Sequence, residues 1–272
     1  MTTMPPKPDY YATERARVFQ EETVARQYHL RPPYPEGLFA ALAALVVDDP
    51  RTILDVGTGP GDLARRLLSV ADRVDAVDVS LAMIEQGRSL EHGDDPRLRW
   101  IHGRAEEAPL DPPYALVAAG DSLHWMDWHV IVPRIADVLS PNGSLAIVSR
   151  DWGTGQPEER EILSRYGQRP SFFRPLLNAV RELESRGLFE VRGRQGFKSE
   201  WRPTIDEYIG CRHSQAAVPR DPEQAHAFKD DTRALLERLV REGRLEADGE
   251  RLCLPVESGI AWGIPRAWPE AD

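Results

Sequence analysis

Short apolar segments alternate with amphipathic segments through the middle of the chain. The apolar segments have the length of buried strands and span residues 52–56, 74–79, 98–102, 114–119 and 145–148. Between them, residues 63–70, 81–90 and 130–139 place apolar side chains at helical spacing. Strands that alternate with helices predict a mostly parallel sheet covered by helices on both faces.

The pattern differs on either side of this core, which we assign to residues 49–150. Residues 14–29 and 38–47 predict two helices of an N-terminal helical cap (1–48), separated by the Pro-rich segment 31–35. Residues 151–250 predict a mainly helical region, with 189–201 extended inside it, and residues 251–272 a terminal strand and tail. The expected fold is α/β, with a doubly wound, mostly parallel, Rossmann-like sheet of seven strands. The helical lobe is inserted after the fifth strand.

Composition narrows the possible partners. The 272 residues carry 34 Lys+Arg against 44 Asp+Glu, a net charge of −10, so we expect no nucleic-acid or anionic-membrane footprint. We also expect no membrane-spanning helix, because no apolar run reaches about 18 residues. The two cysteines, Cys211 and Cys253, form no ligand motif, which predicts no metal site and a reducing, cytoplasmic compartment.

The most informative motif is the glycine-rich segment 55–62, which follows a predicted strand and opens a helix. Glycine permits a tight turn and a close approach of the backbone to a ligand. Asp78 ends the next strand, and a carboxylate there can accept hydrogen bonds from both ribose hydroxyls. These features predict a site for an adenosine-type cofactor at the carboxyl ends of the first two strands. The alternative is an ordinary strand–helix turn capped by Asp62.

Two cofactors compete for this site. In a dinucleotide fingerprint, GxGxxG, the third glycine would fall at Asp62, and a carboxylate there would repel a pyrophosphate. S-adenosylmethionine (SAM) has no phosphate and carries a cationic sulfonium and an ammonium group. A loop flanked by Asp55 and Asp62 therefore favours SAM over NAD(P).

The chain resembles the class I SAM-dependent methyltransferases in four ordered segments, at residues 54–61, 77–83, 103–109 and 118–125. A weaker likeness, at Tyr28, 31–35 and 201–214, is to the trans-aconitate-methyltransferase-like and ubiquinone-biosynthesis-like branches. The resemblance implies cofactor contacts from Tyr28, Arg31, Asp55, Gly57, Thr58, Gly59, Gly61, Asp78, Val79, Met83, Arg104, Ala105, Glu106, Gly120 and Asp121. The three loop glycines would line the methionine half, Asp78 would hold the ribose and Met83 would pack on the adenine. Arg31 would pair with the cofactor carboxylate, or else be a solvent-exposed loop cation.

For the methyl acceptor the sequence offers weaker candidates. His124 is a candidate general base, since its ordinary pKa lies near neutral pH, but it also fits a structural position. In the resembled family, insertions after the fifth strand commonly shape the acceptor pocket. Aromatic candidates for that pocket, each of which also fits a core position, are Tyr34, Trp125, Trp152, Phe172, Phe173 and Trp201.

The resemblance implies a SAM-dependent methyltransferase (EC 2.1.1.-) that releases S-adenosylhomocysteine and methylates a small molecule by in-line displacement. The main alternative is a non-catalytic SAM-binding protein, and a weaker one is an NAD(P)-dependent oxidoreductase. A monomer and a homodimer fit the sequence equally well. The acceptor, and whether its O, N, C or S atom is methylated, stay open.

Overall fold

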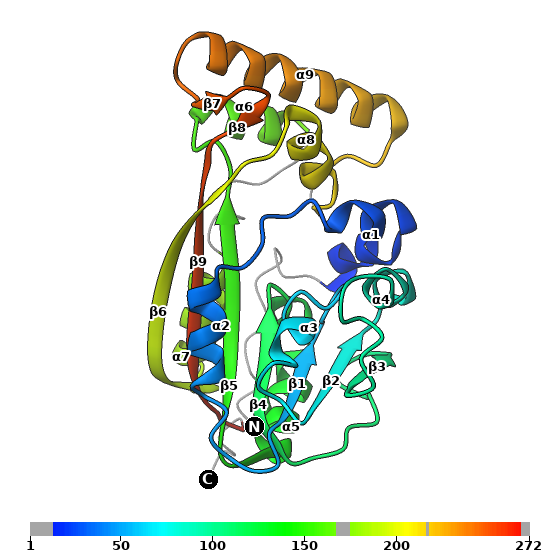
Figure 1. Cartoon of the computed structure of the whole chain (residues 1–272), viewed down its shortest axis with the longest axis vertical. Helices are drawn as coiled ribbons and strands as arrows, with labels where there is room; N and C mark the ends of the chain where they lie inside the picture. The colour runs from blue at the N-terminus through cyan, green and yellow to red at the C-terminus, as the bar shows by residue number, and fades with distance from the viewer. Residues whose placement is uncertain (1–12, 167–174, 216–217, 268–272) are drawn as a thin grey trace.

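The computed structural model describes residues 13–166, 175–215 and 218–267 (Figure 1). It has a sheet flanked by helices, with a lobe beyond one end of the sheet. Within the described residues no helix is long and apolar enough to cross a membrane. No group of three or more His, Cys, Asp or Glu side chains in these ranges could hold a metal ion.

The sheet has seven strands in the order β3-β2-β1-β4-β5-β9-β6. Their bounds are β1 Thr52–Val56, β2 Arg73–Asp78, β3 Leu98–His102, β4 Tyr114–Gly120, β5 Leu139–Trp152, β6 Phe189–Trp201 and β9 Leu254–Pro265. Strands β1 to β5 pair in parallel, while β9 runs antiparallel to both of its neighbours, β5 and β6. This confirms the expected mostly parallel, doubly wound, seven-stranded sheet.

Helices cover both faces of the sheet. They are α2 (Glu36–Ala43), α3 (Ala64–Leu67), α4 (Leu81–Arg88), α5 (Trp128–Val138) and α7 (Pro175–Ser185). Side chains of α2 and α3 share one core cluster with Ile53, whereas α5 and α7 share the opposite cluster with Leu54. All five residues of β1 are therefore buried, which is typical of a parallel strand covered on both sides.

The region after Arg150 differs from the expected single helical insertion. Helices α6 (Pro157–Arg165), α8 (Ile205–His213) and α9 (Pro222–Arg241) form the lobe with the short strands β7 (Ala247–Asp248) and β8 (Arg251–Leu252). Between α6 and α8, however, α7 and β6 return to the sheet, where β6 pairs with β9 over its whole length. The lobe is thus built by two excursions of the chain. The long strands β5 and β6 lead from the sheet to the lobe, and β9 returns the chain from the lobe to the sheet (Figure 1).

The N-terminal segment forms two short helices where one was expected. The 3-10 helix η2 (Thr13–Gln20) and helix α1 (Glu22–Tyr28) are separated at Glu21, whose backbone is extended. The buried side chains Val24 and Ala25 pack against Met83 of α4. This packing holds α1 over the carboxyl ends of the strands, between α4 and the lobe helix α8 (Figure 1).

Candidate functional site

A cavity of about 660 Å³ lies at the carboxyl ends of β1, β2 and β4, beneath the N-terminal helices. Thirteen of the residues singled out in the sequence line it: Tyr28, Arg31, Gly57, Gly59, Asp78, Val79, Met83, Arg104, Ala105, Glu106, Gly120, Asp121 and Trp125. Three more, Tyr34, Asp55 and Thr58, line a much smaller cavity of about 10 Å³ that shares Tyr28, Gly57 and Gly120 with the large one. The sequence motifs therefore converge on one place.

The glycine loop reaches the cavity through backbone conformations that suit glycine. Gly57, Gly59 and Gly61 have φ values of 65°, 57° and 80°. A Cβ on Gly59 would lie 3.8 Å from the Tyr28 ring, on the cavity wall. Gly61, expected to line the site, serves packing instead, because a Cβ there would lie 2.7 Å from Trp100.

Asp78 ends β2 with its carboxylate beside the glycine loop. Its two oxygens accept hydrogen bonds from the backbone N–H groups of Gly59 at 2.7 Å and Ser80 at 2.8 Å. Burial raises the pKa of Asp78, an effect that these two donors oppose. Each carboxylate oxygen can accept more than one hydrogen bond, so the group can also accept from ligand hydroxyls in the cavity.

Asp55 lies under the loop and not in the large cavity. Its Oδ2 accepts hydrogen bonds from Thr58 Oγ1 at 2.6 Å and from the Ala64 N–H at 3.2 Å. Burial raises the pKa of Asp55 to about 7. Asp55 and Thr58 thus stabilise the turn and the start of α3, and their contact with any ligand would be through the small cavity.

Asp62 is paired with two arginines, which the sequence did not predict. Its carboxylate accepts a hydrogen bond from Arg150 at 2.9 Å and pairs with Arg65 at 3.5 Å. Because two guanidinium groups balance its charge, repulsion of a phosphate by Asp62 no longer follows from the sequence. The preference for SAM over a dinucleotide must rest on the other features of the site.

Arg150 is a residue of this region that sequence reasoning missed. It leaves the end of β5 with a side chain only 3% exposed, donates to the Pro32 carbonyl at 2.6 Å and stacks 4.3 Å from the Tyr34 ring. Its Nε lies 3.8 Å from Asp121 Oδ2, which also accepts from the Tyr34 hydroxyl at 3.2 Å. A charged residue at the carboxyl end of a parallel strand was the available signal.

The N-terminal segment supplies a wall that the sequence did not predict. Ala16, Arg17, Phe19 and Gln20 of η2 line the cavity. The Ser80 hydroxyl donates to the Phe19 carbonyl at 2.8 Å, which ties η2 to the loop after β2. The Phe19 ring meets Trp125 edge to face, with centroids 6.1 Å apart.

The far end of the cavity, beside β2 and β3, is formed by Met83, Gly103, Arg104, Ala105 and Glu106. Glu106 Oε1 accepts hydrogen bonds from the Asp127 N–H at 2.9 Å and from Arg104 at 3.2 Å. These bonds join the loop after β3 to the loop after β4. Of the residues that line this end, Met83, Arg104, Ala105 and Glu106 were singled out in the sequence. Gly103 and the members of the second loop, namely Ser122, Met126, Asp127 and His129, were not.

His124 is placed differently from the expectation of a residue in the site. It is 8% exposed, and its ring lies against Trp125 with centroids 4.5 Å apart. Among the described residues, those lining the large cavity include His129 and Trp125 but not His124. The role of His124 as a base stays a prediction.

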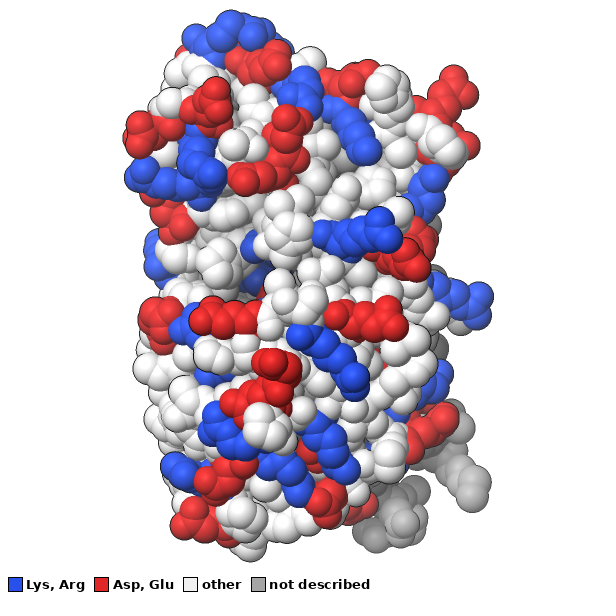
Figure 2. Space-filling view, turned by 45° about the vertical axis from the view of Figure 1, so that its right-hand side comes forward, with Lys and Arg blue, Asp and Glu red and all other residues white. Residues whose placement is uncertain are grey.

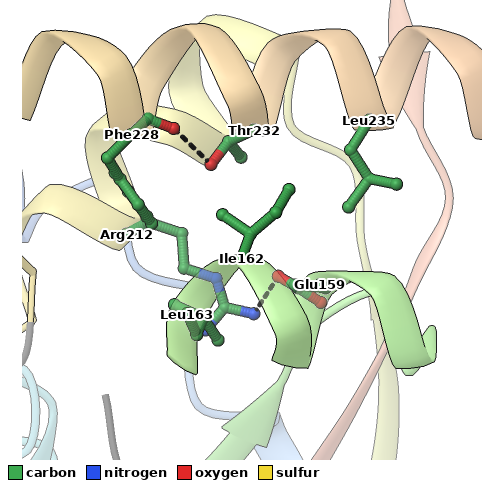
Figure 3. Close-up of a pocket in the computed structure, with 7 residues that line it drawn as sticks. All are labelled: Glu159, Ile162, Leu163, Arg212, Phe228, Thr232 and Leu235. Atoms are coloured by element: carbon green, nitrogen blue, oxygen red, sulfur yellow. Dashed lines mark hydrogen bonds and ion pairs between the residues drawn. The ribbon is translucent and has the colours of Figure 1, made fainter. Parts of the chain in front are cut away.

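The expected acceptor residues of the lobe do not join this cavity. Trp152 and Trp201 pack on each other, with centroids 5.2 Å apart, and on Tyr208 in the lobe's own core. Figure 3 shows the centre of the lobe, where Arg212 pairs with Glu159 at 2.5 Å next to apolar side chains of α6 and α9. Phe172 and Phe173 lie outside the described residues.

Charges are mixed on the surface that Figure 2 shows. Acidic and basic side chains lie interleaved from the lobe to the sheet, without a continuous basic track on the part of this face that is described. A single-sign field that would attract a polyanion is therefore not a feature of this face.

Comparison with known proteins identifies a methyltransferase domain in the part of the chain that forms the cavity. The sequence profile of the methyltransferase domain matches residues 53–143. An uncharacterized methyltransferase of Mycobacterium tuberculosis (strain ATCC 25618 / H37Rv) is 35% identical over 141 residues, which is 50% of this chain and 55% of the relative. The trans-aconitate 2-methyltransferase of Enterobacter sp. (strain 638) is 33% identical over 113 residues, or 40% and 43% of the two chains. The chain thus spans about half the length of the curated relatives it matches.

Solved structures share the fold. A candidate type II methyltransferase from Anaeromyxobacter dehalogenans superposes with a TM-score of 0.63 at 23% identity, over 87% of this chain and 99% of the other. A SAM-dependent methyltransferase from Geobacter sulfurreducens, in complex with S-adenosylhomocysteine, gives a TM-score of 0.54 at 19% identity over 98% and 100%. Residues 53–143 of the chain thus match a methyltransferase domain, and the fold around them is shared with SAM-dependent methyltransferases.

Proposed function

We propose that this chain binds SAM in the 660 Å³ cavity and transfers its methyl group to a small-molecule acceptor. The observation that carries the proposal is the pairing of the Asp78 carboxylate with the Gly59 backbone at 2.7 Å on the cavity wall. This pairing offers acceptors for ribose hydroxyls directly beside a loop whose backbone a ligand can approach closely.

From the β3 side of the cavity to the β4 side, successive groups of lining residues would bind the adenine, the ribose and the methionine part of SAM. Met83 and the segment 103–106 would hold the adenine, Asp78 the ribose, and Gly57, Gly59 and Gly120 the methionine part. Asp121 lies at that last end, where its carboxylate would attract the ammonium group of the cofactor.

Methyl transfer from SAM depends more on the alignment of the acceptor with the methyl group than on a general base. When bound, SAM supplies an activated methyl group on a sulfonium, so the chain must align an acceptor with it and exclude water. Phe19, Tyr28 and Trp125 form the aromatic walls that would exclude water. His124 remains a candidate base for acceptors that must lose a proton, and its ring lies against Trp125 of the cavity wall.

Two observations support a small acceptor. The cavity is covered by the N-terminal helices, whose contact with Ser80 and Trp125 leaves a concave site and not an open track. One relative, the trans-aconitate 2-methyltransferase, is named for a small molecule. We therefore place a small-molecule acceptor ahead of a nucleic acid.

The binding claim is tested by calorimetry with SAM, S-adenosylhomocysteine and NAD. We expect the first two to bind and NAD to give no heat; binding of NAD without SAM would favour the oxidoreductase alternative. Catalysis is tested by release of S-adenosylhomocysteine from SAM in a metabolite extract. SAM binding with no release in any extract fraction would favour a non-catalytic SAM-binding protein.

A further inference from the structure

Arg31 joins the cavity wall to the lobe. Its Nε donates to the Ser214 hydroxyl at 3.0 Å, and its Nη2 donates to the Ser214 carbonyl at 2.8 Å. Ser214 is fully buried and caps the carboxyl end of α8, where the partial negative charge of the helix dipole favours a cation. Ser214 therefore binds one edge of the guanidinium group, the edge formed by Nε and Nη2.

The other side of the guanidinium group holds Tyr28. Arg31 Nη1 donates to the Tyr28 hydroxyl at 2.9 Å, and Arg31 Cζ lies 3.9 Å from the centre of the Tyr28 ring. The ring of Tyr28 reaches the glycine loop, since a Cβ on Gly59 would lie 3.8 Å from it. Ser214, Arg31, Tyr28 and Gly59 thus form a continuous series of contacts from the lobe to the cavity.

Helix α8 is firmly held, so Ser214 is a fixed point. A capping box between Thr204 and Glu207 begins the helix. In its last turn, Arg212 pairs with Glu159 of α6 at 2.5 Å (Figure 3). Gly210 permits close packing on the N-terminal segment, because a Cβ there would lie 2.6 Å from Leu30 Cδ1.

We propose that Ser214 is a positioning residue that acts through Arg31 to hold Tyr28 over the methionine part of the SAM site. Within the described part of the chain, the residues lining the cavity include Tyr28 and Arg31 but not Ser214. The lobe thereby affects SAM binding without touching SAM. This inference rests on the proposed function.

The test is a double-mutant cycle on the SAM dissociation constant, which isolates coupling between residues. Ser214→Ala is expected to weaken SAM binding about fivefold in the otherwise unchanged chain. In a Tyr28→Phe chain, which lacks the hydroxyl that Arg31 binds, the same change is expected to weaken binding less than about twofold. Equal losses in both chains would contradict the proposal.

Ser89→Ala is the matched control. Ser89 also caps a helix, and its hydroxyl donates to a carbonyl three residues earlier at 2.7 Å, as Ser214 does to Cys211. Ser89 is exposed and binds no arginine among the described contacts, so SAM affinity should not change. A loss in Ser214→Ala no larger than in this control would overturn the role of Ser214.

Two further measurements keep the outcome decisive. If Ser214→Ala does not fold, Ser214→Gly replaces it, since glycine also lacks the hydroxyl that Arg31 binds and is well tolerated at the carboxyl end of a helix. A fivefold loss is again expected, and wild-type affinity would contradict the proposal. If the unchanged chain binds no SAM, the proposed function itself fails; if it binds SAM and only the cycle is additive, the failure is confined to Ser214.

Discussion

Arg150 donates a hydrogen bond to Asp62 at 2.9 Å, although 88 positions separate the two residues in the chain. The bond joins the end of β5 to the start of the helix that follows the glycine loop. Arg150 also donates to the Pro32 carbonyl at 2.6 Å, so one buried cation joins three segments beside the glycine loop.

Removing this cation should destabilise the fold. Arg150→Met removes one of the two guanidinium partners of Asp62 and the arginine beside the half-buried Asp121, and we expect the free energy of unfolding to fall by about 3–5 kcal/mol. Urea denaturation measures the change. Arg165→Met is the control, because it breaks a far more exposed pair with Asp231 and should cost much less. Equal losses in the two variants would show that the Arg150 pair does not stabilise the site.

Asp78→Asn should weaken SAM binding by about 1–3 kcal/mol, or roughly fivefold to 150-fold. The amide keeps the shape of the side chain but loses one acceptor oxygen, so Gly59, Ser80 and the ribose hydroxyls can no longer all be satisfied. Calorimetric titration gives the affinity, with the exposed Asp248→Asn as control. Unchanged affinity would place the ribose elsewhere.

Asp55 should make stability depend on pH. Its pKa is about 7 in the folded chain and about 4 when unfolded, so between these values the folded state binds more protons. The contribution of Asp55 to stability is therefore complete below pH 4, declines as the pH rises towards 7 and is constant above it. The difference in the free energy of unfolding between the native chain and Asp55→Asn should therefore change by about 3–5 kcal/mol over this pH range. A difference between the two chains that does not vary with pH would refute the shift.

Trp201 should matter to the lobe and not to the cofactor. It packs on Trp152 and Tyr208 in the lobe core, so Trp201→Ala should lower the free energy of unfolding by about 3 kcal/mol. SAM affinity should change less than about twofold. Trp125→Ala, at the cavity wall, should give the opposite result, with weaker SAM binding and a smaller loss of stability. A large loss of SAM affinity in Trp201→Ala would show that Trp201 contributes to the SAM site.

The local pattern of the sequence was enough to predict the sheet and most of the cavity. Each short apolar strand is followed by its own loop, and in a parallel sheet these loops meet at one edge, so Gly59, Asp78, Glu106 and Asp121 come together. The same reasoning correctly gave the seven strands, including the extended segment now seen as β6.

The errors concern long-range pairing. The balance of Asp62 by Arg150 depends on tertiary contacts that no local pattern records. Helix α7 and strand β6 pack on the sheet, whereas Trp152 and Trp201 pack inside the lobe. The sequence shows that these segments have apolar faces but not which other element each face contacts. Phe19 is held in the cavity wall by a hydrogen bond from the Ser80 hydroxyl to its backbone carbonyl. The type of side chain at position 19 does not predict such a backbone bond.

A crystal structure of the chain with saturating S-adenosylhomocysteine would show where the ligand binds. We expect the ligand in the cavity under η2 and α1, with its ribose hydroxyls on the Asp78 carboxylate and its homocysteine part between Gly59 and Asp121. A ligand bound in the lobe, or bound in the cavity with its ribose away from Asp78, would contradict this expectation.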